Sequence, residues 1–207
     1  MSTLATDFIH AFEPASGVSL GVPPVLLLHG TGGDERDLLP FGRMVAPGAA
    51  LLSPRGPVLE NGMPRFFRRL AEGVFDEDDL RRRTDDLASF IRSAQAAHGL
   101  GAPVVIGFSN GANIAASLLL RHPGLLRGAA LLRAMVPFRD PPAVRLEGTP
   151  VLLLSGAADP IVPAANSDRL AAMLEAAGAA VQHHRLPLGH GLSQMDVALT
   201  RDWMAGL

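Results

Sequence analysis

The sequence predicts an α/β fold with a mostly parallel central sheet and helices on both faces. Short runs rich in valine and leucine alternate along the chain with longer segments of helical periodicity. This alternation is typical of parallel sheets, whose strands are buried on both sides and connected by helices. The loops that follow three of the apolar runs hold Ser109, Asp159 and His190. Loops at the carboxyl ends of parallel strands are where such sheets gather their reactive groups.

The composition bounds both the architecture and the chemistry. We expect one domain over residues 1–207, a length that supports a full core. A net charge of −2 with 48% hydrophobic residues argues against disorder and against a nucleic-acid partner. All 18 basic residues are arginines and cysteine is absent, which excludes a lysine Schiff base, a phosphate-loop lysine and thiolate metal sites. Without a signal pattern or a long apolar stretch, we expect a cytoplasmic protein that does not associate with membranes.

Seven apolar or β-branched runs are predicted to be strands. They lie at 8–12, 25–29, 49–53, 103–108, 128–135, 149–155 and 180–186. Helical periodicity or helix-forming composition predicts helices at 34–45, along the apolar stripe from Leu80 to Ala94, and at 112–121, 168–177 and 192–203.

The most informative stretch joins the strand at 103–108 to the helix at 112–121. It reads Gly107-Phe108-Ser109-Asn110-Gly111. A strand that turns into a helix within about one residue forces its central residue into a strained conformation, and the flanking glycines remove side chains that would collide there. This G-x-S-x-G pattern presents a serine nucleophile at the tip of the turn. The alternative is a turn in which Ser109 merely caps the helix.

The chain order of the polar candidates favours the nucleophile. Ser109, Asp159 and His190 follow one another in the order expected of an α/β-hydrolase. Asp168 fits less well because it is expected inside a helix, and His183 because it lies within a strand. The sequence therefore predicts an α/β-hydrolase fold in which Ser109 is the nucleophile, His190 the base and Asp159 its partner.

A second glycine-rich loop, Gly30-Thr31-Gly32-Gly33-Asp34, follows the strand at 25–29. Its glycines would let main-chain N–H groups approach a ligand, although the phosphate-binding patterns are absent. We expect the N–H groups of Thr31 and Asn110 to form an oxyanion hole. The neighbouring His29 is expected to organise this loop through hydrogen bonds rather than to act as the base.

Residues 54–79 form a long segment without clear periodicity, which is typical of functional loops. Its phenylalanines either line a pocket or pin a surface loop to the core, and the sequence leaves both possibilities open. The apolar candidates for substrate binding are Phe66, Phe67, Phe75, Ile161, Val162 and Leu192.

The acidic cluster at 76–79 also allows two interpretations. It could hold a metal ion, or it could be the solvated start of a helix that faces the arginines at 81–83. Acidic side chains suit the positive end of a helix dipole, and the spacing to the arginines is helical, so the second interpretation is favoured.

Four motifs, HGTGGD, GFSNGAN, GAADPIVP and GHGLS, resemble the carboxylesterase/phospholipase family of single-domain α/β-hydrolases, which includes the acyl-protein thioesterases. The resemblance extends over nearly the whole chain and implies the same roles for Ser109, Asp159 and His190, with N–H donors at Thr31 and Asn110. Acyl-protein thioesterases usually have glutamine where this chain has Asn110, but the donor is main chain. The segment SPRGPVLENGMPRFFRR also resembles bacterial carboxylesterases associated with hydroquinone resistance.

These observations predict a serine hydrolase that cleaves small-molecule carboxylic esters or thioesters of short to medium acyl chain through an acyl-enzyme, without metal or organic cofactor. Only residues 136–150 are available where many α/β-hydrolases insert a lid domain, so we expect an open or loop-walled site without a lid. An acyltransferase and a non-catalytic ligand-binding hydrolase fold remain as alternatives. A homodimer is compatible with the sequence, although the chain has no strong dimerisation motif.

Overall fold

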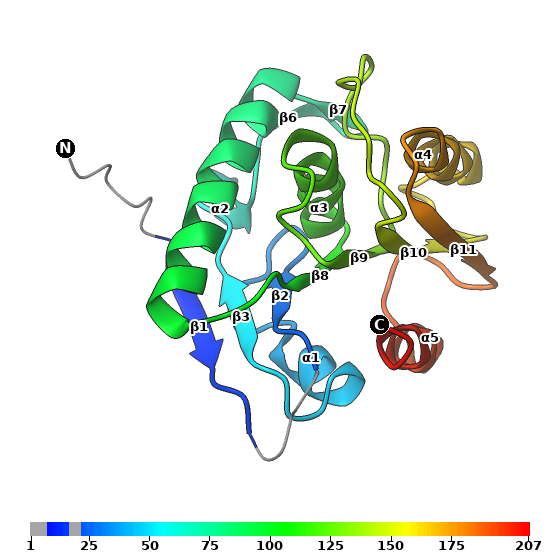
Figure 1. The fold of residues 1–207 in the computed structure, drawn as a ribbon. Helices are drawn as coiled ribbons and strands as arrows, with labels where there is room; N and C mark the ends of the chain where they lie inside the picture. The colour runs from blue at the N-terminus through cyan, green and yellow to red at the C-terminus, as the bar shows by residue number, and fades with distance from the viewer. Residues whose placement is uncertain (1–7, 17–21) are drawn as a thin grey trace.

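A seven-stranded sheet forms the centre of the computed structural model, which describes residues 8–16 and 22–207. Its strands follow the order β1-β3-β2-β8-β9-β10-β11 (Figure 1). β1 pairs antiparallel with β3, and the other pairs are parallel, as predicted. The bounds are β1 His10–Glu13, β2 Val25–Leu28, β3 Leu51–Pro54, β8 Val104–Phe108, β9 Gly128–Leu132, β10 Pro150–Gly156 and β11 Ala180–Leu186.

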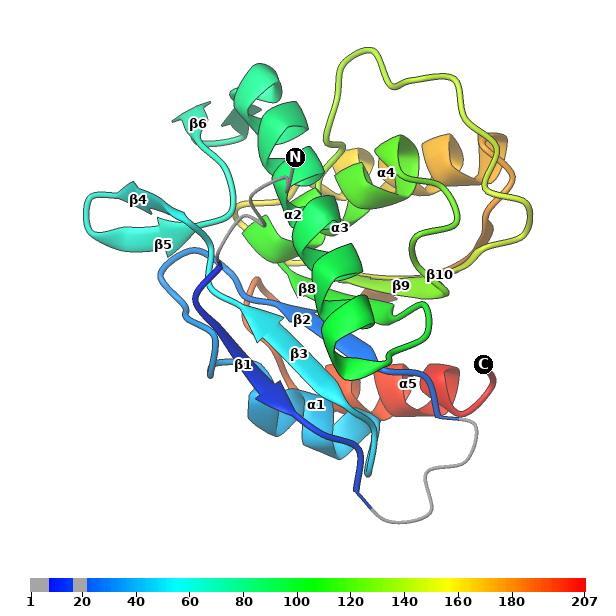
Figure 2. The ribbon, with the colours of Figure 1, turned by 60° about the vertical axis from the view of Figure 1, so that its left-hand side comes forward.

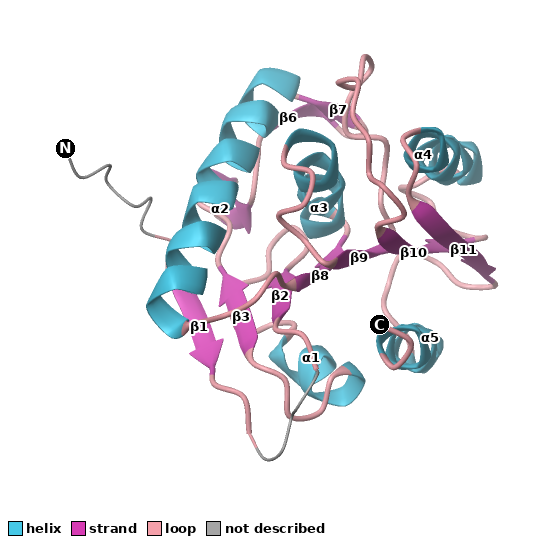
Figure 3. Cartoon of the chain, in the orientation of Figure 1, coloured by secondary structure: helices cyan, strands magenta, loops and turns pink. Residues whose placement is uncertain are grey.

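Five helices cover the two faces of this sheet. They are α1 Leu39–Val45, α2 Glu77–His98, α3 Asn110–Arg121, α4 Ala164–Ala176 and α5 Gln194–Met204. α2, α3 and α4 lie on one face, and α1 and α5 lie on the other (Figures 1 and 3). None of the helices in the described ranges is both long and apolar enough to cross a membrane. The α/β fold with helices on both faces is therefore confirmed.

Each central strand contributes side chains to two separate cores. In β2 the residues Leu26 and Leu28 pack beneath α2 and α3, whereas Val25 and Leu27 pack on the side of α1 and α5. All four are fully buried because both faces of the sheet are covered. This burial is the physical reason why the strands are continuous apolar runs rather than alternating ones.

Several element boundaries differ from the prediction for local reasons. The helix expected at 34–45 begins at Leu39, because the Asp34 carboxylate accepts the Arg36 N–H and holds the preceding residues in turns. The strand expected to reach residue 135 ends at Leu132, because Arg133 has a left-handed φ of 58°. α4 begins at Ala164, four residues before its predicted start.

The segment at 54–79 contains two small hairpins that were not predicted. The first joins β4 Val58–Glu60 to β5 Met63–Arg65, and the second joins β6 Arg69–Ala71 to β7 Val74–Phe75. The β4–β5 hairpin projects away from the central sheet (Figure 2). Asn61 and Gly62 form its two-residue turn with φ of 51° and 79°. An Asn-Gly pair is the strongest short-range signal for such a turn, so the sequence did contain the information.

The order of the strands also fixes where a site can form. From β2 the chain moves outward to β3 and then returns to β8 on the other side of β2. The loops that leave β2 and β8 therefore diverge from adjacent strands and leave a crevice at their carboxyl ends. Ligands of open α/β sheets bind in such a crevice.

The tight contact between α3 and β2 makes one glycine essential to the fold. A Cβ atom at Gly111 would lie 2.0 Å from the carbonyl oxygen of Leu28, which is main chain and cannot rotate away. We expect Gly111→Ala to lower the free energy of unfolding by about 1 to 3 kcal/mol, measured by urea denaturation. Gly101→Ala is the control, because a Cβ there meets no atom within 4 Å. Equal stability of the two variants would contradict the prediction.

Candidate active site

Ser109 lies on the turn between β8 and α3 in a strained conformation. Its φ is 51° and its ψ is −112°, a combination that costs about 1 to 3 kcal/mol for a residue with a side chain. The surrounding contacts hold it there: the Ser109 N–H donates to the Leu132 carbonyl at 2.9 Å, and the Ser109 carbonyl accepts the Asn113 N–H at 3.0 Å. The elbow is thus fastened to the end of β9 and to the first turn of α3.

The structure brings the three polar candidates of the sequence together in one hydrogen-bonded chain. His190 Nε2 lies 2.9 Å from Ser109 Oγ, and His190 Nδ1 lies 2.8 Å from Asp159 Oδ2. The Asp159 side chain is fully buried, whereas that of His190 is 19% exposed. The imidazole therefore connects a buried carboxylate to a hydroxyl at the surface of a cleft.

The second carboxylate oxygen of Asp159 also has partners. Asp159 Oδ1 accepts the N–H groups of Ile161 at 2.8 Å and Val162 at 3.0 Å. Burial alone would raise the pKa of Asp159, but these N–H donors and the bond to His190 outweigh it, so the pKa lies below its ordinary value. Asp159 is consequently held as a carboxylate, the form that orients a histidine through its Nδ1–H.

The loop after β2 lies beside the cleft and is held by main-chain hydrogen bonds. The Gly32 N–H donates to the Pro64 carbonyl and the Gly33 N–H to the Gly30 carbonyl, so both are occupied. Thr31, between these residues, lines the cleft with Ser109. The Thr31 hydroxyl oxygen accepts a hydrogen bond of 2.6 Å from Arg65 Nη1, which holds the Thr31 side chain against the 54–79 segment.

Asn110 begins α3, where main-chain N–H groups have no partner within the helix. Its side chain stabilises the surrounding main chain, because Asn110 Oδ1 accepts the Phe66 N–H at 2.7 Å. Asn113 acts similarly by accepting the Met135 N–H at 2.7 Å. These two amides tie the 54–79 segment and the loop after β9 to the first turn of α3.

His29 organises the β2 loop, as the sequence predicted. Its Nδ1–H donates to the Gly30 carbonyl at 2.7 Å, and its Nε2 accepts the Gly56 N–H at 2.9 Å. The ring is fully buried and packs 4.8 Å from the Phe66 ring. Burial lowers the pKa of His29, which keeps the imidazole neutral and able to accept at Nε2.

An open cleft of about 340 Å³ lies over Ser109. Of the six predicted substrate-binding residues, Phe75, Ile161 and Val162 line it. The wall residues that were not predicted from the sequence are both polar and apolar: Arg65, Arg69, Glu72, Gly73, Phe108, Asn113, Arg133 and Met135. The arginines were missed because a charged residue in an irregular or apolar run carries no pattern that places it in a cleft.

The prediction was wrong for Phe66, Phe67 and Leu192, which do not line the cleft. Phe66 and Phe67 are completely buried in the core beneath α2 and α3. The Phe67 ring packs edge-on against that of Phe75 at 5.0 Å, so it supports the cleft wall from behind. Leu192 packs on the opposite core, beside α5. The segment thus both pins itself to the core and lines the cleft, which were the two possibilities left open.

The competing residues His183 and Asp168 lie elsewhere. His183 Nε2 is 2.8 Å from Ser155 Oγ, and His183 Nδ1 is 3.9 Å from an Asp168 oxygen. A serine, a histidine and an aspartate therefore lie together here, as they do at Ser109. However, Ser155 is only 2% exposed, and none of the three residues lines the cleft. Buried away from the cleft, Ser155 cannot serve as a nucleophile for a substrate bound there.

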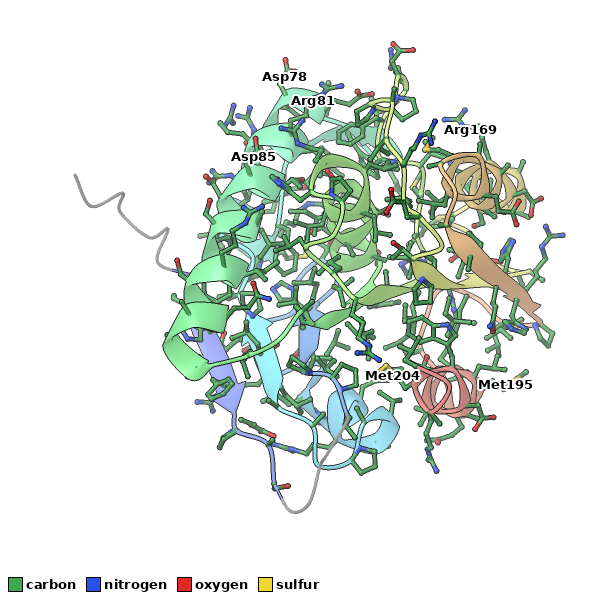
Figure 4. All side chains as sticks on the ribbon, viewed as in Figure 1. Asp78, Arg81, Asp85, Arg169, Met195 and Met204 are labelled. Atoms are coloured by element: carbon green, nitrogen blue, oxygen red, sulfur yellow. The ribbon has the colours of Figure 1, made fainter. Side chains whose placement is uncertain are left out.

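The acidic cluster forms the start of α2. Asp76 caps the helix by accepting the Asp79 N–H at 3.0 Å. Arg81 pairs with Glu77 at 3.0 Å and with Asp78 at 3.2 Å, and the side chains of Asp78 and Arg81 project from this end of the helix (Figure 4). No metal-binding cluster of histidine and acidic residues occurs within residues 8–16 and 22–207. The carboxylates are therefore used in capping and in ion pairs.

The sheet order, the strained serine and the hydrogen-bonded Ser109, His190 and Asp159 define an α/β-hydrolase. Within this class the chain belongs to the phospholipase/carboxylesterase family, whose model matches residues 21–205. It is a hydrolase of the carboxylesterase type.

Similar proteins come from several bacteria. The chain is 47% identical to the hydrolase MhqD of Bacillus subtilis (strain 168) over 181 residues, which cover 86% of this chain and 90% of MhqD. The crystal structure of a Bacillus cereus carboxylesterase superposes with a TM-score of 0.92 at 46% identity, covering 96% of this chain and 94% of that one. A carboxylesterase from Mesorhizobium loti gives a TM-score of 0.86 at 36% identity, with coverage of 92% and 93%.

The burial of neutral His29 predicts how the folding stability depends on pH. Its folded-state pKa is lowered, so the unfolded chain binds a proton first, and stability is lost as the pH falls below about 6.5. We expect urea denaturation at a series of pH values to show the parent losing up to about 1.4 kcal/mol more per pH unit than His29→Gln. Identical slopes for parent and His29→Gln would contradict the assignment.

Proposed function

We propose that this protein hydrolyses carboxylic esters or thioesters of short to medium acyl chain through a covalent acyl-enzyme on Ser109. The observation that carries the proposal is the hydrogen-bonded chain from Asp159 through His190 to Ser109 at an open cleft. Nucleophile, base and orienting carboxylate are the groups that acyl transfer requires at this spacing.

In the first half of the reaction, His190 Nε2 accepts the proton of Ser109 Oγ as the oxygen attacks the acyl carbonyl. Asp159 accepts a hydrogen bond from the His190 Nδ1–H and stabilises the imidazolium that forms. The tetrahedral intermediate then collapses as His190 donates its proton to the leaving alcohol or thiol. The products of this half are the free alcohol or thiol and an ester between the acyl group and Ser109.

In the second half, His190 removes a proton from water, which attacks the acyl-enzyme and releases the carboxylic acid. Ser109 recovers its proton from His190, so the protein returns to its starting state. Each proton transfer in the proposed reaction uses a side chain of this chain.

The N–H groups of Thr31 and Asn110 are the proposed oxyanion donors. Both residues line the cleft beside Ser109, from the adjacent strands β2 and β8. A donor of this kind typically contributes about 3 kcal/mol to the stability of the transition state. Because both donors are main chain, the asparagine at position 110 meets the requirement as well as a glutamine would.

The size and surroundings of the cleft support small substrates. Its volume is about 340 Å³, near the lower end of the range for ligand pockets. The residues between β9 and β10 form neither helix nor strand, so this connection places no lid domain over the cleft. Phe75, Ile161 and Val162 supply apolar contacts for a short acyl chain.

Replacement of the nucleophile is the direct test. We expect Ser109→Ala to fold as the parent does and to lose about six orders of magnitude in kcat for p-nitrophenyl butyrate. The parent should be labelled covalently by an organophosphonate serine probe, and the variant should not.

Ester hydrolysis retained by Ser109→Ala would refute the proposal. A folded parent that neither turns over esters nor reacts with the probe would favour a ligand-binding protein instead. Transfer of the acyl group to an added alcohol in preference to water would indicate an acyltransferase.

The cleft wall predicts how two phenylalanine variants differ. Phe75→Ala enlarges the cleft and should shift the preferred p-nitrophenyl ester from acetyl or butyryl toward octanoyl. Phe67→Ala removes a completely buried ring and should instead cost about 3 to 5 kcal/mol of folding stability, measured by urea denaturation. An unchanged chain-length profile in Phe75→Ala would show that the acyl chain binds elsewhere.

A further inference from the structure

We infer that Arg133 is the residue that positions His190 for the proposed reaction. It follows the last residue of β9 and is completely buried. The inference rests on the proposed function, because His190 must accept the proton of Ser109 for its position to matter.

All five N–H groups of the Arg133 guanidinium are used. Nε donates to the Gly189 carbonyl at 3.0 Å, and Nη2 donates to the Gly191 carbonyl at 3.1 Å. Nη1 reaches the Leu154 carbonyl at 3.3 Å. The remaining two N–H groups bind the two carboxylate oxygens of Asp196 at 2.8 and 3.1 Å. A guanidinium has five donors in a rigid plane, so this set leaves it no freedom to move.

Two of these bonds hold the residues immediately before and after His190. Gly189 and Gly191 have no side chains with which to fix the loop, and glycine is the most flexible residue in the main chain. The guanidinium supplies the missing restraint by binding both carbonyls from one rigid group. The main chain on both sides of His190 is therefore held by Arg133.

The chain that follows His190 is held by Asp196, the carboxylate that pairs with Arg133. Asp196 Oδ2 accepts the Ser193 N–H and the Ser193 hydroxyl, both at 2.8 Å. Asp196 is completely buried in the first turn of α5, and Ser193 caps that helix. The chain leaving His190 is thus fixed by the carboxylate that binds Arg133.

The main chain at β9 connects this clamp to the nucleophile. The Ser109 N–H donates to the carbonyl of Leu132, the residue before Arg133. The Arg133 N–H donates to the Leu154 carbonyl of β10 at 2.8 Å, and Asp159 follows that strand. The dipeptide Leu132–Arg133 therefore sets the positions of Ser109 and His190 relative to each other.

Buried ion pairs of this kind do not themselves guarantee stability, because removing charges from water is costly. Replacing both partners together is often tolerated, whereas removing one leaves an unpaired buried charge. The double variant Arg133→Met/Asp196→Asn avoids that charge and keeps an oxygen for Ser193. Arg133→Lys keeps the charge but cannot span both glycine carbonyls, since an ammonium lacks the planar fork.

The control is a second bidentate pair, more exposed than the first and away from the cleft. Arg121 on α3 binds Asp85 on α2 at 2.7 Å, and Asp85 is labelled in Figure 4. Neither residue lines the cleft. Arg121→Met/Asp85→Asn therefore makes the same two chemical changes without touching the His190 loop.

We expect both Arg133 variants to lose about 10- to 100-fold in kcat for p-nitrophenyl butyrate, with KM changed by less than about threefold. The rate of labelling by an organophosphonate probe should fall in proportion. The control should match the parent in both measurements. Urea denaturation establishes that each variant is folded, and a loss of kcat without a change of KM separates positioning from substrate binding, because Arg133 also lines the cleft.

The low-field proton resonance of the hydrogen bond between His190 and Asp159, assigned by its loss in His190→Ala, gives a readout without substrate. It should shift or broaden in the Arg133 variants and not in the control. Folded Arg133 variants with parental kcat and an unchanged resonance would overturn the inference. A parent without turnover or labelling would refute the proposed function separately, and the resonance would still decide whether Arg133 positions His190.

Discussion

The sharp turn from β8 into α3 is the constraint on which the rest of the site depends. It holds Ser109 at a left-handed φ of 51° and brings α3 so close to β2 that a Cβ at Gly111 would collide with a main-chain oxygen. Such strain persists only where the surroundings over-determine it. Here the sheet provides that support, because Leu132 of the neighbouring strand accepts the Ser109 N–H.

The other components are assembled from loops at the same edge of the sheet. Thr31 follows β2, Asp159 follows β10 and His190 follows β11, so residues far apart in the sequence meet because parallel strands end together. Loops alone are poor supports for a precise geometry. The contacts of Asn110 with the 54–79 segment and of Arg133 with the His190 loop convert flexible connections into a fixed frame.

The sequence predicted the features that depend on local pattern. Buried parallel strands are apolar runs, and the elbow at Ser109 needs its glycines within a few residues, so both could be recognised without a structure. The depth of Phe66 could not, because neighbouring aromatic residues in an irregular segment have no period that distinguishes core from cleft. The role of Arg133 depends on carbonyls more than fifty residues away. In the sequence, this role is indicated only by the presence of an arginine at the end of an apolar run.

The uncovered cleft has a consequence for the timing of turnover. In enzymes with a mobile cover, opening and closing on the microsecond to millisecond scale often limits the rate. The connection from β9 to β10 in this chain forms no helix or strand that could act as such a cover. Substrate and water would then reach Ser109 without waiting for that connection to open.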